Sequence, residues 1–326
     1  MASSVYPAPR APAPALWLIA AAAIAAIPAG ALLAQGSQGP FTVVESGRSF
    51  ARLQDAVNAV GNGSASIAIA PGTYRQCAVQ QGGEISYLAS EPGKVIFDGV
   101  TCEGKAALVL RGRSASVSGM TFRNMAVPDF NGSGIRLEQG DLTVAQSWFQ
   151  DSQQGILTHN APQSRIVIDK STFSRLGTCE GAGGCAHSIY VGEYGLLRVT
   201  RSRFEQGRGG HYVKARAKRV EIASSSFDDS KGRATNYMID LPGGAQGQIS
   251  NNWFVQGREK ENYSAFITIA PEGRQTDSTG LLIAGNDARF APGVTRNSTF
   301  IANWTDDRVA IGPNELGSGI KVSDRR

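Results

Sequence analysis

The chain has 326 residues, of which 41% are hydrophobic and 18% charged, and glycine occurs 39 times. This composition excludes a disordered or collagen-like chain, and the many glycines favour a fold rich in turns. The formal net charge is +5, and the excess is concentrated between Arg198 and Arg219, where eight basic residues stand against one acid, Glu205. Such a segment attracts polyanions, either nucleic acid or acidic polysaccharide.

The first predicted element is an apolar segment over residues 15–34, which follows Arg10. A plausible small-x-small cleavage site at residues 29–31 predicts a signal peptide over residues 1–34. The segment is also long enough to be an uncleaved membrane anchor. Both alternatives export the domain from residue 35 onward, so we expect a periplasmic, secreted or outer-surface protein. Export argues against nucleic acid as the partner and leaves acidic polysaccharide.

A short amphipathic helix is predicted over residues 49–60, because Phe50, Leu53, Val57 and Val60 share one helical face. We expect this helix to cap the first coil of the fold and to cover a sheet edge.

The four cysteines suit two disulfides in an oxidising compartment. Cys77 and Cys102 lie one repeat apart, and Cys179 and Cys185 could close a small loop. Reduced, buried thiols are the alternative.

Six segments end in the same way, with apolar residues alternating before a final phenylalanine. These final residues are Phe122, Phe149, Phe173, Phe204, Phe227 and Phe254. The apolar positions are spaced by two, which is the period of a β-strand and excludes helical repeats. The pattern predicts short strands stacked in register, one unit per repeat. Two positions before the phenylalanine, a serine column either faces inward or lies exposed in turns; it consists of Ser147, Ser171, Ser202 and Ser225.

Between residues 66 and 74 the chain reads Ser-Ile-Ala-Ile-Ala-Pro-Gly-Thr-Tyr. A cap helix, a strand, this Pro-Gly-Thr-Tyr turn and the coils that follow resemble the pectin-lyase-like superfamily over roughly residues 41–290. The resemblance implies an all-β fold, a single-stranded solenoid of the right-handed parallel β-helix type. We expect coils over about residues 66–302 and a C-terminal tail over 303–326. The superfamily includes lyases, hydrolases, epimerases and non-enzymatic members.

Each unit has a second strand about sixteen residues before its phenylalanine. We align an inward column in these strands, consisting of Ile135, Ile156, Ile189, Val213, Ile239 and Ile267. Alternation points the neighbouring residues outward, and stacking at about 5 Å brings successive coils together. One outward patch is therefore predicted to contain His187, Tyr190, His211, Lys214, Arg216, Tyr237 and Asp240, with His159 one coil away.

This set of residue types fits proton abstraction from C5 of a uronate in an acidic polysaccharide. His211 or Lys214 would be the base, since burial among cations lowers either pKa. Tyr190 or Tyr237 would protonate the leaving oxygen, and Arg216 or Lys214 would stabilise the developing enolate. Elimination gives a lyase, and reprotonation from the opposite face gives a C5-epimerase.

The remaining expectations concern substrate contacts and cofactors. We expect further substrate contacts from His187, Asp240, Arg201 and Arg203, no metal or other cofactor, and a monomer.

Two other functions are open. A non-catalytic scaffold that binds acidic glycan or assists surface assembly would use the same basic face. A glycoside hydrolase would need two carboxylates, for which the candidates are Asp240, Asp228, Asp229 and Glu193.

Overall fold

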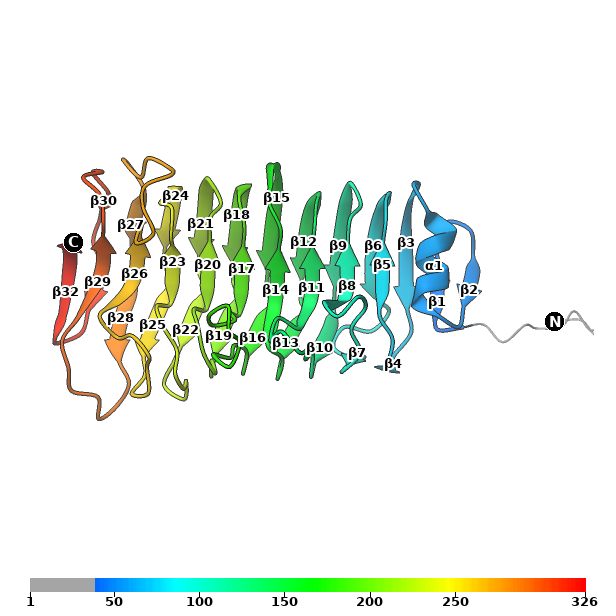
Figure 1. Ribbon diagram of the computed structural model, residues 1–326, viewed down its shortest axis with the longest axis horizontal. Coiled ribbons are helices and arrows are strands. Elements are labelled where there is room, and N and C mark those ends of the chain that lie inside the picture. Colours follow the sequence, from blue (N-terminus) through cyan, green and yellow to red (C-terminus); the bar gives the residue numbers. More distant parts are fainter. Residues whose placement is uncertain (1–38) are drawn as a thin grey trace, which may run out of the picture. The chain divides into compact units, whose positions relative to one another are not determined.

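Apolar residues alternate along short strands, and these strands form a stack of coils (Figure 1). The computed structural model describes residues 39–326, so the predicted signal peptide or anchor over 1–34 lies outside the described residues. Coils contribute strands to three sheets, called A, B and C here, and strands of successive coils pair in parallel. Within residues 39–326, no helix is both long and apolar enough to cross a membrane.

Sheet A has twelve strands, and its first three differ from the rest because β1 pairs antiparallel with both β2 and β3. In spatial order the strands are β2 (Arg48–Phe50), β1 (Phe41–Val43), β3 (Ser64–Ile69), β6 (Glu84–Ala89), β9 (Ser114–Ser118), β12 (Asp141–Ala145), β15 (Ala161–Asp169), β18 (Tyr194–Thr200), β21 (Arg219–Ala223), β24 (Gln246–Ser250), β27 (Leu282–Ala284) and β30 (Ala310–Ile311).

Sheet B carries the repeated phenylalanines, whose rings form a continuous buried stack. From Phe122 to Phe254, neighbouring ring centroids lie 4.8–5.1 Å apart. The strands are β4 (Gly72–Tyr74), β7 (Val95–Asp98), β10 (Met120–Arg123), β13 (Trp148–Gln150), β16 (Thr172–Ser174), β19 (Arg203–Glu205), β22 (Ser226–Asp228), β25 (Trp253–Gln256), β28 (Asp287–Phe290) and β31 (Glu315–Leu316).

Sheet C contains the predicted inward column, which is buried and in register from Ile135 to Ile267. Its strands are β5 (Ala78–Gln80), β8 (Ala106–Leu110), β11 (Ser133–Leu137), β14 (Gln154–Thr158), β17 (Ile189–Val191), β20 (Val213–Ala215), β23 (Ile239–Leu241), β26 (Ala265–Ile269), β29 (Ser298–Asn303) and β32 (Ile320–Arg325). The observed architecture is therefore the stack of strands that the repeat predicts, and it has the right-handed parallel β-helix form that the resemblance implies.

The serine column lies inside the corner between sheets A and B. Each hydroxyl is buried and accepts a backbone N–H from the preceding coil; Ser171 N–H donates to Ser202 Oγ at 3.2 Å, for example. Each hydroxyl also donates to a carbonyl of its own coil, as Ser202 does to Thr200. Asn252 and Asn286 continue the column. The inward alternative is thus correct, and the partners of the hydroxyls are backbone groups.

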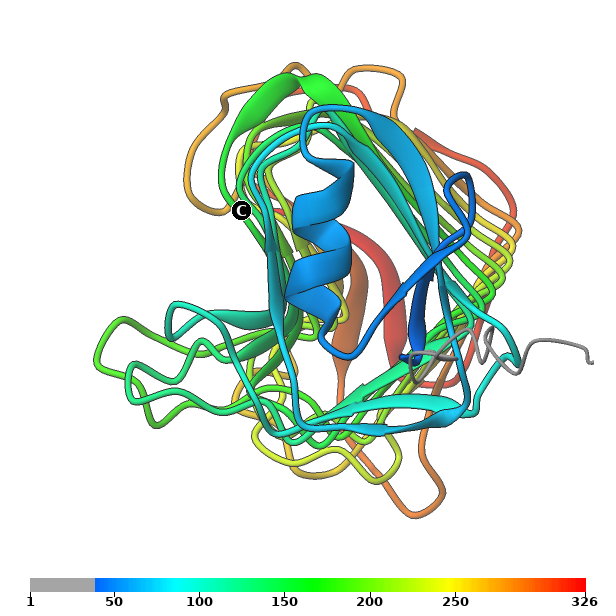
Figure 2. The same ribbon diagram turned by 90° about the vertical axis from the view of Figure 1, so that its right-hand side faces the viewer.

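The N-terminal helix α1 (Leu53–Val60) lies across the end of the solenoid (Figure 2). Gln54 holds it there, because its side-chain amide accepts from the N–H of Val79 and donates to the carbonyl of Val79 in edge strand β5. The predicted start at residue 49 is wrong. Ser49 and Phe50 belong to β2, where pairing with β1 satisfies their backbone.

The predicted C-terminal tail over residues 303–326 is also wrong, because this segment forms most of another coil. Strand β32 pairs with β29, and Asn314 accepts the N–H of Asn286 at 3.0 Å, which extends the buried column. The sequence pattern fades here because no phenylalanine marks this coil.

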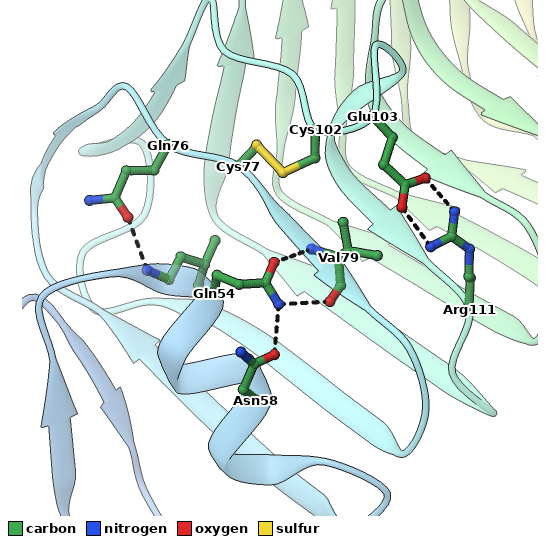
Figure 3. The surroundings of a disulfide bond; sticks show 9 residues. Gln54, Asn58, Gln76, Cys77, Val79, Cys102, Glu103 and Arg111 are labelled. Carbon is green, nitrogen blue, oxygen red and sulfur yellow. Dashed lines mark hydrogen bonds and ion pairs between the residues drawn. A yellow bond between two sulfur atoms is a disulfide. The ribbon is translucent and has the colours of Figure 1, made fainter.

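Both expected disulfides are present. The disulfide between Cys77 and Cys102 links two neighbouring coils beside helix α1 (Figure 3). The disulfide between Cys179 and Cys185 closes one loop. Described residues contain no free cysteine.

Candidate functional site

The outward residues of sheet C bring three coils together at one place. Tyr190 in β17, Lys214 in β20 and Asp240 in β23 are directly paired neighbours in the sheet. The long connections that lead from sheet B to sheet C pass over this region. They partly cover it, and Asp240 is 2% exposed although it points away from the core.

His187 and His211 stand one coil apart, just before β17 and β20, with ring centroids 5.0 Å apart. The ring of Tyr237 stacks on His211 from the next coil, at 5.6 Å. Nδ1 of His187 accepts the backbone N–H of His211 at 3.0 Å. This close contact requires glycine at position 210, because a Cβ there would lie 2.5 Å from His187 Nδ1 and φ is +60°.

Burial keeps both histidines neutral at neutral pH. Desolvation, aided by the charge of Lys214, lowers the pKa of His211 to about 3. Desolvation and the neighbouring His211 hold the pKa of His187 well below its usual range. Nε2 of His211 lies 3.5 Å from Asp240 Oδ2, and its buried Nδ1 has no hydrogen-bond partner among residues 39–326.

Lys214 lies between two carboxylates and is protonated. Its Nζ is 3.1 Å from Asp240 Oδ2 and 2.6 Å from Glu272 Oε1. Burial alone would lower the pKa of Lys214, but these two carboxylates raise it above its usual value. The expectation that burial among cations lowers this pKa is therefore wrong, because the neighbours that matter are acids.

Glu272 is the site residue that the sequence did not reveal. It lies on the twelve-residue connection between β26 and β27, and its carboxylate bridges Lys214 and Arg216. The two cations hold the pKa of Glu272 at about 2. No periodic signal points to Glu272, since it is 56 residues or more from its partners and outside the repeated strands.

The two candidate tyrosines have different surroundings. Nε of Arg216 donates to the hydroxyl of Tyr190 at 3.1 Å, which places this phenol beside a cation. The hydroxyl of Tyr237 instead accepts from the side chain of Asn262 at 2.7 Å. Tyr190 therefore shares the cationic part of the site, whereas Tyr237 packs against His211.

Most of these side chains line one pocket of about 420 Å³, within the range of ligand sites, whereas Tyr237 and Asp240 lie behind its lining. Its lining includes His187, Tyr190, His211, Lys214, Arg216 and Glu272. The acids Asp129 and Glu261 lie at the same pocket, so its charges are mixed rather than purely basic.

Arg201 and Arg203 do not join this pocket. Arg201 follows β18 and pairs with Asp169, and Arg203 lies in sheet B and pairs with Glu205. More broadly, seven of the eight basic residues between Arg198 and Arg219 form ion pairs, several with acids of neighbouring coils. Stacking therefore neutralises much of the charge that looks free in the linear sequence.

The carboxylates considered for hydrolysis are also scattered. Asp229 is buried and pairs with Lys260 at 3.0 Å, with both side chains fully covered. Asp228 lies in sheet B, and Glu193 is exposed between β17 and β18. His159 is exposed at the end of β14, outside the pocket.

Three sheets of mainly parallel strands, built from stacked coils, are the architecture of a right-handed β-helix protein. The chain belongs to this family: the family model "Right handed beta helix region" matches residues 99–325. No curated protein sequence matches the chain.

Solved structures share this fold at low identity. ORF18 of Geobacillus virus E2 is 14% identical with a TM-score of 0.44, over 83% of this chain and 56% of that chain. Escherichia coli ybhc is 12% identical with a TM-score of 0.44, over 86% and 85%. The Streptococcus pneumoniae surface protein and adhesin PfbA is 9% identical with a TM-score of 0.37, over 84% and 94%. The chain thus spans little more than half of the viral protein, and likenesses of this size carry no function.

Proposed function

We propose that the pocket on sheet C binds a uronate unit of an acidic polysaccharide and removes its C5 proton. One observation carries the proposal: Lys214 and Arg216 together hold a carboxylate, that of Glu272. A substrate carboxylate in the place of Glu272 would meet the same two cations. The Glu272 side chain is 44% exposed on a connecting loop, so it can give way to such a ligand.

The reaction would begin with abstraction of the C5 proton by His211. This histidine is neutral, whereas Lys214 is protonated and serves as a cation. The electrons of the broken C5–H bond move into the carboxylate, which becomes an enolate stabilised by Lys214 and Arg216. In a lyase the enolate then collapses to a C4–C5 double bond, the C4–O bond breaks, and Tyr190 protonates the leaving oxygen.

Reprotonation of the same enolate at C5 from the opposite face would instead invert the sugar. The lyase and the epimerase therefore share the first step and differ only in the second. Both act on a polymer found outside cells, and the two disulfides support work in an oxidising compartment.

A second candidate function is glycan binding without turnover. It is favoured by the pKa of about 3 for His211, because a general base works best when its pKa lies near the working pH. A binding site needs only donors and acceptors for a sugar, and the pocket offers both.

Incubation with defined polyuronates in D₂O separates these functions. We expect deuterium at C5, detected by NMR, if the protein is an epimerase, and an unsaturated product that has lost its C5 hydrogen if it is a lyase. His211→Asn should lower the exchange about 100-fold or more while polymer binding persists. Tyr190→Phe should stop elimination but leave exchange in place. A polymer that binds wild-type protein without exchange and without an unsaturated product would establish the binding function instead.

One further variant tests the carboxylate site itself. Glu272→Gln should tighten binding of a uronate disaccharide, because it frees Lys214 and Arg216 from their internal partner. For His211→Asn, the matched control is His159→Asn, because His159 is exposed outside the pocket. A chelator should leave exchange unchanged, since no step uses a metal.

A further inference from the structure

A second pocket lies on the corner between sheets B and C, and its lining is strongly basic. Its volume is about 680 Å³. The charged residues that line it are five cations and one acid, namely Arg175, Arg208, Lys231, Arg233, Arg258 and Glu259.

Only part of this positive charge is neutralised. Arg175 and Arg208 share one acid, Asp151, at 2.7 and 3.0 Å. Lys231 and Arg233 are exposed, and neither forms an ion pair with any of residues 39–326. The pocket therefore keeps a net positive charge, in contrast to the mixed charges of the pocket on sheet C.

The loop that carries Lys231 and Arg233 is held in place by the buried carboxylate of Asp229. Asp229 accepts hydrogen bonds from Tyr212 and Thr235 and pairs with Lys260. Gly232 sits directly on this carboxylate, since a Cβ there would lie 1.9 Å from Asp229 Oδ1. A buried, fully bonded anchor fixes the backbone that presents Lys231 and Arg233, so less ordering is needed when a ligand binds.

The cations recur along the axis of the solenoid. Arg208, Lys231 and Arg258 each follow a stacked phenylalanine by four residues in three successive coils. Neighbouring coils are about 4.8 Å apart, close to the length that one pyranose unit adds to an extended glycan. A polymer with one carboxylate per sugar would therefore meet about one cation per coil.

This basic pocket is next to the pocket on sheet C. Only Gly209 and Gly210 lie between Arg208, in its lining, and His211, so their backbones are no more than about 11 Å apart. The two pockets are therefore close enough for one polymer chain to contact both.

We propose that the basic pocket is a second binding site for the acidic polysaccharide, which takes carboxylates of sugar units away from the one bound on sheet C. This inference shares its ligand with the proposed function but does not depend on any chemistry there. Attraction between the pocket and a polyanion would be partly screened by salt.

The test compares a long polyuronate with a uronate disaccharide, using the full chain. In Lys231→Gln/Arg233→Gln we expect binding of the polymer to weaken about tenfold at low salt and to depend less steeply on salt. Binding of the disaccharide should stay unchanged. The control is Lys170→Gln/Lys218→Gln, which removes the same charge from exposed positions outside both pockets.

The inference is overturned if both double variants lose polymer affinity equally, or if neither does. A selective loss in Lys231→Gln/Arg233→Gln supports it even if wild-type protein shows no C5 exchange, which would contradict only the proposed chemistry. If exchange persists and the polymer binds both double variants as it binds wild type, the proposed chemistry stands and the second binding site is refuted.

Discussion

The corner between sheets A and B and the corner between sheets B and C are built in opposite ways. From β12 to β25 the A-to-B corner has two residues in every coil, and its second residue is a buried serine or asparagine. The B-to-C connection ranges from three residues after β13 to fourteen after β16. Both corners adjoin the strands of sheet B, one at each end, so the difference lies in the connections.

The contrast separates what stabilises the coils from what distinguishes them. The A-to-B corner repeats because each coil must satisfy the N–H groups of its neighbour inside the core. The B-to-C connections face solvent and can grow without disturbing the stack. Both pockets lie where these connections pass, and so does the buried pair of Asp229 and Lys260.

The largest expected effect falls on the repeated interior. Phe204→Ala removes a ring stacked at 4.9 Å on Phe173 and at 4.8 Å on Phe227. We expect a loss of about 3 to 5 kcal/mol in the free energy of unfolding, measured in urea. Ser226→Ala, on the outward side of the next strand, is the control and should stay within about 0.5 kcal/mol. Equal effects of the two variants would contradict a core built by the stack.

Lys260→Met tests whether the irregular corner also contains a structural anchor. It leaves the buried carboxylate of Asp229 without its cation, and we expect a loss of about 3 kcal/mol. This is the lower end of the usual range, because Tyr212 and Thr235 still donate to Asp229. The exposed Lys231→Met should change stability by less than about 0.5 kcal/mol. A small effect of Lys260→Met would show that this corner contains no structural anchor.

The pH dependence of stability should show whether His211 is buried in the pocket on sheet C. Burial lowers the pKa of folded His211 to about 3 from 6.5, so the unfolded chain takes up a proton first as the pH falls. Stability is therefore lost below about pH 6.5. Between pH 7 and pH 5 this histidine accounts for about 2 kcal/mol. His211→Asn should flatten the profile by that amount and His159→Asn should not; identical profiles for wild type and His211→Asn would show that His211 is not covered in solution.

The smallest expected effect concerns one member of the serine column. Ser202→Ala leaves the buried N–H of Ser171 without an acceptor, and we expect a loss of about 1 to 2 kcal/mol. Ser202→Asn should restore most of it, because Asn252 and Asn286 make the same contact in later coils. If thermal or urea unfolding shows asparagine to be no better than alanine, the corner is not held by this hydrogen bond.

The stacked architecture follows from the sequence because strand periodicity is local. A residue two positions from another lies on the same face of a strand, and the Phe column repeats this in every coil. The same rule places Tyr190, Lys214 and Asp240 side by side from their spacing alone, and the structure pairs them so. It failed where the period stops, at the start of α1 and in the last coil, because pairing with β1 and β29 decides those segments.

The sequence by itself determined the strands, their inward and outward faces and the neighbours along each column, since all of these depend on spacing alone. Only the tertiary structure decided which charged residues lie beside those columns. Glu272 reaches Lys214 from an aperiodic loop, and Asp169 reaches Arg201 from the preceding coil. Ion pairs form wherever folding brings opposite charges within a few ångströms, and distance in space has no fixed relation to distance along the chain.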